Sequence, residues 1–208
     1  MNMEYIRADQ LPFDPRPQMS MIFADGFYMW LRFFSKDKAK LARAFAHIFD
    51  LSHFYVAIQD GEVAALVSST AGNISQIKLD KKTLYRELGC IRGHIAYAAL
   101  TKNLVNHVYP FELPPQTGTI EFVATAPAFR GKGVAQGLIA HVMENMPYAE
   151  YMLEVADNND TALRLYEKLG FIAFMRTSAP IGSGFKHYVY MKCRSKSVVL
   201  TNESEDCI

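Results

Sequence analysis

A strand, a basic glycine loop and a helix follow one another between Thr119 and Leu138, and this stretch constrains the fold most. β-forming residues from Ile120 to Val123 predict a strand, which Pro127 ends. The loop Arg130-Gly131-Lys132-Gly133 comes next. Apolar side chains then recur at helical spacing, at positions 134, 138, 139, 142, 143 and 146.

This order of elements predicts an anion-binding site. The first backbone N–H groups of a helix have no partner inside the helix, and the helix dipole adds partial positive charge there. Glycines let the backbone approach a phosphate closely, and Arg130 and Lys132 add full charges. We therefore expect a phosphate-bearing ligand at this loop.

Two common phosphate motifs fit the loop poorly. A P-loop needs a serine or threonine after its lysine to hold magnesium, but Lys132 is followed by Gly133. A dinucleotide fingerprint needs its third glycine one residue closer than Gly137. Glu150 and Glu154 fall near the offset of a ribose-binding acid, so the dinucleotide interpretation stays open.

Signals for further elements lie on both sides of this centre. An Asp-Gly pair between two β-rich runs predicts a hairpin, and aromatic residues crowd one early helix. The predicted elements are a strand at 5–8, a loop at 11–17, helices at 20–34 and 36–49 (the second capped by Ser35), hairpin strands at 53–59 and 62–69, a helical stretch at 81–107 divided at Gly89 or Gly93, a strand at 151–156, a helix at 161–169 and strands at 171–177 and 187–193.

The alternation of strand and helix from 119 to 170 predicts a parallel strand pair joined by a right-handed crossover. Hairpins on both sides of that pair predict antiparallel strands around it. We therefore expect an α/β fold of the α+β type, in which a mixed, mostly antiparallel sheet carries helices on both faces.

Composition argues against several classes of function. The net charge of +1 argues against broad electrostatic binding to nucleic acid or to an anionic membrane. No run approaches the roughly 18 apolar residues of a membrane helix, and the first ten residues lack a signal-peptide core. Cys90, Cys193 and Cys207 have no ligand spacing, and no other cluster suggests a metal. These features predict a cytoplasmic protein without a metal cofactor.

Two linked blocks carry a resemblance to a known family. Residues Arg130 to Ala135 have the form Arg-x-x-Gly-x-Ala, which resembles the coenzyme A pyrophosphate loop of the GNAT superfamily of N-acetyltransferases. Downstream, Leu153-Glu-Val155, then Asn159 and Ala162, then the run from Leu165 to Phe171 resemble the family's second block in order and spacing. The resemblance covers residues 119–171 closely.

The resemblance implies a single sheet whose two central parallel strands splay apart, within one domain over residues 1–194. The segment 75–110 is then a helical insertion, and residues 195–208 are expected to form a disordered tail. The implied activity is transfer of an acetyl group from acetyl-CoA to an amine in a ternary complex. The acceptor would be a small molecule or a peptide, and a homodimer is left open.

The resemblance also implies the site residues. Main-chain groups near Val123 and Thr125 would bond the pantetheine arm, and Asn159 would help to hold it. Tyr166 would protonate the leaving thiolate; an ordinary helix–sheet contact is the alternative for Tyr166, and a helix cap for Asn159. The full implied cofactor set is Val123, Ala124, Thr125, Arg130, Gly131, Lys132, Gly133, Val134, Ala135, Asn159, Ala162 and Tyr166.

Glu121 is the candidate general base. A protonated amine must lose a proton before it attacks a thioester, and a carboxylate can accept that proton. Strand alternation predicts that Glu121 shares a face with Val123 and Thr125. A salt bridge, an orienting role or an outward orientation are equally open for Glu121. Approach to the acceptor is also open for His94 and His107, in the insertion, but a solvated or packed position on a helix is the favoured interpretation for both.

Two questions stay open at this point. A non-catalytic module that senses acyl-CoA is the alternative to an enzyme. The acceptor is not encoded in the two blocks, so we expect the aromatic helix 20–34 and the insertion to line its pocket.

Overall fold

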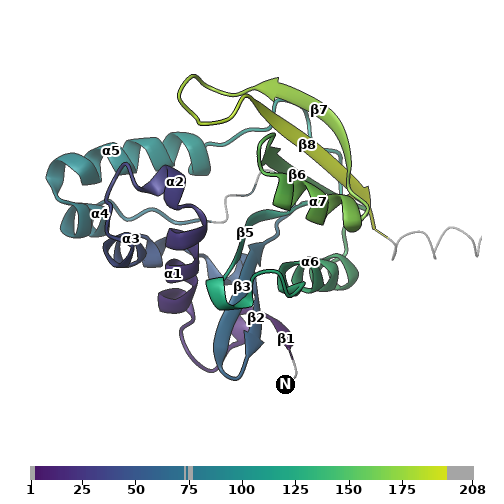
Figure 1. The fold of residues 1–208 in the computed structure, drawn as a ribbon, viewed down its shortest axis with the longest axis horizontal. Coiled ribbons are helices and arrows are strands. Elements are labelled where there is room, and N and C mark those ends of the chain that lie inside the picture. The colour runs from purple at the N-terminus through teal and green to yellow at the C-terminus, as the bar shows by residue number, and fades with distance from the viewer. Residues whose placement is uncertain (1–2, 73, 75–76, 196–208) are drawn as a thin grey trace, which may run out of the picture.

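The computed structural model describes residues 3–72, 74 and 77–195 (Figure 1). It contains both strands and helices, with short 3₁₀ and π turns between some of them. In order they are β1 (Glu4–Arg7), α1 (Arg16–Gly26), α2 (Tyr28–Leu31), α3 (Lys38–Phe45), β2 (Phe54–Gln59), β3 (Glu62–Ser68), α4 (Lys81–Leu88), α5 (Cys90–Leu100), β4 (Thr117–Thr119), β5 (Glu121–Thr125), α6 (Val134–Asn145), β6 (Glu150–Ala156), α7 (Asp160–Lys168), β7 (Ile172–Ser178) and β8 (His187–Arg194).

The strands form two four-stranded sheets, and the chain passes directly from one sheet to the other between β4 and β5. One sheet has the order β1-β2-β3-β5 and the other β4-β6-β8-β7, and only β4 and β6 are parallel. β4 and β5 are separated by a single residue, Ile120. The mixed, mostly antiparallel architecture is therefore confirmed, and the expected single sheet divides where the chain passes from β4 to β5.

Helices cover both faces of this arrangement, as predicted. In Figure 1, α1 to α5 lie on one side of β3 and β5, whereas α6 lies on the other. Two hydrophobic clusters follow the same division. The first joins α1, α3, α4 and α5 to the first sheet, and the second joins α6, β6, α7 and β8. None of the described helices has the length and apolar character needed to cross a bilayer.

Three boundaries in the early helices differ from the sequence-based expectation. α1 begins at Arg16, so Pro17 lies in the first turn, where a missing N–H breaks no helical hydrogen bond. The aromatic stretch breaks at Phe27 and ends at Leu31 rather than running to residue 34. Asp37 caps α3 by accepting a hydrogen bond from the Lys40 N–H, while Ser35 Oγ accepts one from the Asp37 N–H.

The helical part of the insertion packs as a pair of helices, α4 and α5, against α3. Gly89 divides the pair with a φ of 83°. Gly93 does not divide it: this glycine lies inside α5, where a Cβ atom would stand 2.8 Å from the Leu84 carbonyl oxygen. A glycine is therefore needed there for close helix approach.

The expected tail falls almost wholly outside the described residues, which end at Ser195. Ser195 itself is buried, and its N–H donates to the Ala149 carbonyl oxygen over 2.9 Å. This residue therefore continues the ordered chain rather than beginning a tail.

Candidate active site

The parallel strand pair opens immediately after Ile120. The Ile120 N–H donates to the Met152 carbonyl oxygen on β6 over 2.8 Å. Beyond that point β5 pairs with β3 instead, and within the described ranges no strand pairs with its other edge. The splayed pair that the resemblance implied is thus present, and it leaves an unpaired strand edge directed toward β6.

Val123 and Thr125 direct their main-chain groups toward that unpaired edge. The Ala126 N–H donates to the Ala64 carbonyl oxygen on β3 over 2.9 Å. In an antiparallel ladder this orientation alternates, so Ala124 also faces β3 while Val123 and Thr125 face away. The Thr125 carbonyl oxygen already accepts a hydrogen bond from Arg130 Nε at 3.1 Å. No strand of the described ranges pairs with the remaining main-chain groups on this edge.

The glycine loop follows this strand and leads into α6. Gly131 and Gly133 have φ angles of 73° and 76°, and Gly133 is the N-terminal cap residue of α6. A Cβ atom built at either position would meet nothing within 4 Å. The glycines are therefore required by the backbone conformation, and the space above them is open. The free amides of the first turn of α6, including Val134 and Ala135, begin at this open surface.

Arg130 has a partner that the sequence did not indicate. Its guanidinium forms an ion pair with Asp25 at the end of α1, and the same carboxylate pairs with Lys38. The hydrogen bond from Lys38, followed by that from Arg130, holds the pKa of Asp25 below its usual value. Asp25 thus shares one negative charge between two cations, and the Arg130–Asp25 pair ties the loop to α1 and α3.

Lys132 retains an uncompensated charge at the loop. Its Nζ atom lies 5.5 Å from the centroid of the Phe129 ring, and no carboxylate pairs with it in the part of the chain that the structure describes. Lys132 and the backbone amides therefore supply positive potential at the loop, beside the partly paired Arg130.

Asn159 and Ala162 form the N-terminal cap of α7. The Asn159 Oδ1 atom accepts a hydrogen bond from the Ala162 N–H at 3.2 Å. The helix-cap role considered for Asn159 is therefore real. Contact of either residue with a cofactor remains a prediction.

Tyr166 lies on the inner side of α7 and is buried. Its ring packs edge-on against Phe171, with 5.9 Å between centroids. Burial raises the pKa of the Tyr166 hydroxyl. The hydroxyl therefore stays protonated at neutral pH, as a proton donor to a thiolate must.

The prediction that Glu121 shares a face with Val123 and Thr125 is wrong. Phe122 has a φ of 52°, and the pairing register between β3 and β5 shifts at this point. Ile120 and Val123, three residues apart, both pack on the α6 side, so the alternation slips by one residue. Instead, the Glu121 Oε1 atom accepts a hydrogen bond of 2.8 Å from the Tyr109 hydroxyl.

Glu154, which the sequence analysis considered only as a ribose-binding acid, is the candidate base that the sequence reasoning missed. Leu153 and Val155 pack with α6, so Glu154 points from β6 to the opposite face. The Tyr190 hydroxyl, on the paired residue of β8, hydrogen-bonds to the Glu154 carboxyl, and this bond lowers the pKa of that carboxyl. Burial outweighs it and raises the pKa of Glu154 above its usual value.

One carboxyl oxygen of Glu154 makes no hydrogen bond within the described residues. Glu154 Oε2 is buried and has no hydrogen-bond partner among the described residues. The nearest base is His107, whose Nε2 atom lies 3.6 Å away, beyond ordinary hydrogen-bond length. A buried carboxyl with a raised pKa and an unused oxygen has the properties of a general base.

Tyr109 connects the two carboxyl groups. Its hydroxyl donates to Glu121, and its ring lies 6.3 Å from the ring of Tyr190, the partner of Glu154. The two carboxyl groups and the His107 ring therefore gather around one buried tyrosine. His94 does not join them, since its Nδ1 atom pairs with the Tyr85 hydroxyl at 2.8 Å on the exposed side of the insertion.

A signal for Glu154 was present in the sequence. A charged residue stands between two apolar residues in the middle of a predicted strand, directly before the Asn159 to Phe171 block. Charged side chains are rarely placed in a buried strand without a specific partner. The strand alternation alone would have separated Glu154 from the apolar face.

No group of three or more His, Cys, Asp or Glu side chains with metal-binding geometry occurs within residues 3–72, 74 and 77–195. The titratable groups at the candidate site are therefore a carboxyl pair, a histidine and tyrosines.

Comparison with known proteins assigns the family. The family described as "Acetyltransferase (GNAT) family" matches residues 24–171. This match covers more than half of the chain, and the protein belongs to the acetyltransferase (GNAT) family. The matched span includes the glycine loop, Glu121, Glu154 and Tyr166.

Individual relatives are distant. The uncharacterized protein ML0378 of Mycobacterium leprae (strain TN) is 34% identical over 77 residues, which is 37% of this chain and 20% of that protein. The chain thus matches about a fifth of the length of this curated relative.

Two solved structures share the fold over most of their length. An N-acetyltransferase from Staphylococcus aureus Mu50 is 21% identical, covers 91% of this chain and 100% of its own, and has a TM-score of 0.57. The ribosomal-protein-S18-alanine N-acetyltransferase from Escherichia coli is 16% identical, covers 93% of this chain and 94% of its own, and has a TM-score of 0.54. At these identities the likeness concerns the fold.

Proposed function

We propose that this protein transfers an acetyl group from acetyl-CoA to the amine of a small molecule or peptide. The observation that carries the proposal is the opening of the strand pair after Ile120. It leaves an unpaired edge on β5, which leads to the glycine loop, and β6, the strand that pairs with β4, carries the half-buried carboxyl of Glu154. Family membership supports acetyl transfer as the reaction.

The cofactor would lie along the unpaired edge of β5. The pantetheine amides would bond to the main-chain groups of Val123 and to the Thr125 N–H, adding an extended chain to the strand. The pyrophosphate would meet the amides from Gly131 to Ala135, at the N-terminus of α6. Lys132 would add a full charge, while the Arg130–Asp25 pair holds the loop in place.

The proton transfers follow from the two pKa shifts. Glu154 takes the proton from the ammonium of the acceptor, directly or through water, because its raised pKa brings it closer to that of the amine. The free amine attacks the thioester carbonyl, and as the C–S bond breaks Tyr166 gives its proton to the departing thiolate. The nitrogen loses its remaining extra proton through water, which leaves the neutral amide and restores the proton on Tyr166. Glu121, bonded to Tyr109, orients the groups around Glu154 rather than acting as the base.

Coenzyme A binding tests the cofactor half of the proposal. Gly133→Val should weaken binding of acetyl-CoA at least about tenfold, because valine resists a φ of 76° and obstructs the open surface of the loop. Isothermal titration calorimetry measures the affinity. Gly61→Val, in the β2–β3 turn, is the matched control, since Gly61 has a φ of 80° with the same open surroundings.

Thiol release across a panel of amines tests the reaction. Release of coenzyme A that depends on the amine supports an acetyltransferase. Tight binding of acetyl-CoA without amine-dependent release would contradict catalysis and favour a sensor of acyl-CoA. If neither acetyl-CoA binding nor release is observed, the loop has another ligand.

A further inference from the structure

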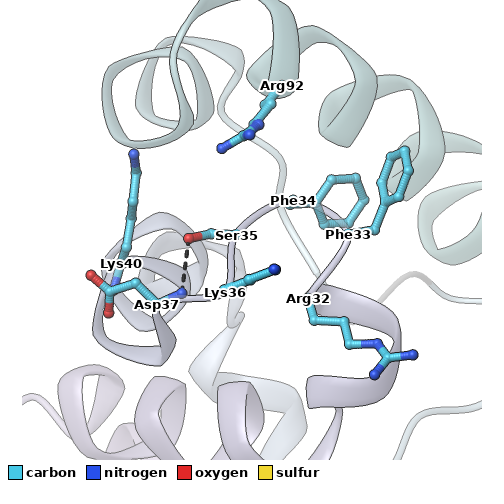
Figure 2. Close-up of a pocket in the computed structure, with 8 residues that line it drawn as sticks. All are labelled: Arg32, Phe33, Phe34, Ser35, Lys36, Asp37, Lys40 and Arg92. Atoms are coloured by element: carbon cyan, nitrogen blue, oxygen red, sulfur yellow. Dashed lines mark hydrogen bonds between the residues drawn. The ribbon is translucent and has the colours of Figure 1, made fainter.

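A second concave site lies away from Glu154, between the segment after α2, the first turn of α3, and α5. Figure 2 shows this pocket, which has a volume of about 480 Å³. Side chains from three separate elements surround it. The lining residues are Arg32, Phe33, Phe34, Ser35, Lys36, Asp37, Lys40 and Arg92.

The lining is strongly basic. Arg32 and Lys36 come from the segment after α2, Lys40 from α3 and Arg92 from α5, against a single carboxylate. That carboxylate, Asp37, accepts the Lys40 N–H and is engaged as the cap of α3.

None of these four cationic side chains has an ion-pair partner among the described residues. Most other arginines near a carboxylate do pair: Arg7 with Asp9, Arg16 with Asp14 and Arg43 with Glu87. The chain as a whole carries a net charge of only +1. The pocket therefore concentrates uncompensated positive charge that is not a general property of the surface.

The floor of the pocket is ordered. Phe34 and Ser35 are buried, and the Phe34 ring packs against Phe45 with 6.3 Å between centroids. Ser35 Oγ accepts the Asp37 N–H at 3.1 Å and fixes the turn before α3. Lys36, Lys40 and Arg92 thus lie around a packed base, whereas the Arg32 side chain is directed away from them (Figure 2). A bound anion would relieve the mutual repulsion of the three cations.

We propose that this pocket binds a phosphate group. Guanidinium groups present planar forks of donors that match phosphate oxygens, and ammonium groups add point charges. Three cations from three parts of the chain, Lys36, Lys40 and Arg92, suit a dianion better than a single carboxylate. The phosphate could belong to the acceptor or to a separate small molecule, and the assignment does not depend on the proposed function.

The position of the pocket links it to the candidate active site. The segment that supplies Arg32 and Lys36 follows α2, and Phe27, just before α2, packs on Phe122 of β5 with 6.3 Å between ring centroids. Trp30 on α2 also packs on Phe185 between β7 and β8. A phosphate held by this segment is therefore coupled through packing to the strand that carries Glu121.

Nuclear magnetic resonance of the full-length protein tests the binding. Inorganic phosphate is titrated into ¹⁵N-labelled protein saturated with coenzyme A. Saturable shifts should appear at residues 32–40 and 92. The double variant Lys36→Gln/Arg92→Gln should lower the affinity for phosphate, measured from these shifts, at least about tenfold. The reason is that the loss of one charge-assisted hydrogen bond lowers an affinity by about that factor. Lys82→Gln, an exposed lysine on α4, is the matched control and should leave them unchanged.

Several results would overturn the proposal. One is the absence of saturable shifts, and another is shifts confined to residues 130–135. Unchanged phosphate affinity in the folded double variant, or in Lys40→Gln if the double variant fails to fold, is a third. If the titration is repeated without coenzyme A, saturable shifts at these residues that appear only in its absence would assign the pocket to the cofactor instead.

Acetyl transfer to ethanolamine and to phosphoethanolamine separates the two sources of the phosphate. A loss of kcat/KM in Lys36→Gln/Arg92→Gln of about tenfold for phosphoethanolamine, with ethanolamine unaffected, places the phosphate on the acceptor. Saturable phosphate binding without that discrimination places it on a separate ligand. If neither amine is acetylated, the proposed function fails on these acceptors while the resonance shifts still decide the pocket.

Discussion

Glu154 and Tyr166 show how one environment prepares two groups for opposite tasks. Burial disfavours the charged form of each, so it raises the pKa of a carboxyl and of a phenol alike. The effect moves Glu154 toward the range of a useful base and keeps Tyr166 protonated as an acid. Tyr190, beside Glu154, has its pKa raised to about 12, so it remains a hydrogen-bond donor.

Glu154→Gln should lower kcat/KM by about 100-fold or more, because general base catalysis typically contributes that much. In the wild type, kcat/KM should rise with pH through an apparent pKa above the usual carboxyl range, and this limb should disappear in the variant. Glu121→Gln is the comparison: it should lower the rate less and keep the limb. A full acidic limb in Glu154→Gln would exclude Glu154 as the base.

The same pKa shift makes a prediction about stability. Because the pKa of Glu154 is higher in the folded state, its contribution is present at low pH and is lost as the pH rises through the folded pKa. The free energy of unfolding of Glu154→Gln should therefore increase relative to that of the wild type as the pH rises from 5 to 8. Chemical denaturation at both pH values measures the difference. If the difference in the free energy of unfolding between variant and wild type stays constant with pH, folding does not shift the pKa of Glu154.

Tyr166→Phe should lower kcat by roughly tenfold to 100-fold with little change in the affinity for acetyl-CoA. The variant removes only the hydroxyl and keeps the ring that packs on Phe171. Stopped-flow or steady-state thiol release gives kcat, and calorimetry gives the affinity. Equal turnover would reduce Tyr166 to a packing residue.

At the scale of elements, the insertion depends on close approach between α4 and α5. Gly93 lies where a Cβ would come within 2.8 Å of the Leu84 carbonyl oxygen and of Tyr85. The helices α3, α4 and α5 pack into one cluster through Leu84, Leu88 and Ala96. The insertion therefore supports Arg92, one wall of the basic pocket, from a fixed position.

Gly93→Ala should destabilise the protein by about 1 kcal/mol. Overpacking costs roughly 1–3 kcal/mol, and the better helix propensity of alanine offsets up to about 1 kcal/mol of it. Urea denaturation measures the change. Ile91→Ala, at an exposed position of the same helix, should stay within about 0.5 kcal/mol of the wild type. A neutral Gly93→Ala would show that the two helices can move apart freely.

At the scale of the whole molecule, Asp25 joins parts of the chain that are far apart in sequence. Its carboxylate pairs with Lys38 at the start of α3 and with Arg130 in the glycine loop. α1 packs on β3 and β5, so the loop is tied to the helical side of the first sheet. The cofactor loop and the segment leading to the basic pocket thus share one anchor.

Asp25→Asn should weaken acetyl-CoA binding by a few-fold, because Arg130 loses the partner that positions the loop. A partly exposed ion pair contributes about 1 kcal/mol or less, which sets the size of the effect. Calorimetry at low salt measures it, with Asp14→Asn, which breaks the Arg16 pair elsewhere on the surface, as the control. Tighter binding by Asp25→Asn would mean that Arg130 binds the phosphate once it is released.

The sequence by itself determined the parts of this protein that depend on local pattern. Glycines at 131 and 133, the Asp60-Gly61 turn and the Asn159 to Phe171 block specify a loop, a hairpin and a capped helix from residues that are neighbours in the chain. The family and the opened strand pair followed from those local signals, because both blocks lie within one strand–helix–strand unit.

Only the tertiary structure decided which side chains meet. The φ of 52° at Phe122 shifts the phase of β5 and moves Glu121 away from the face that alternation predicts. Burial raises the pKa of Glu154 and makes it the stronger base candidate. Asp25 forms an ion pair with Arg130. These outcomes depend on a backbone bulge and on partners that lie 36 to 105 positions away in the sequence, so local pattern does not identify the partners.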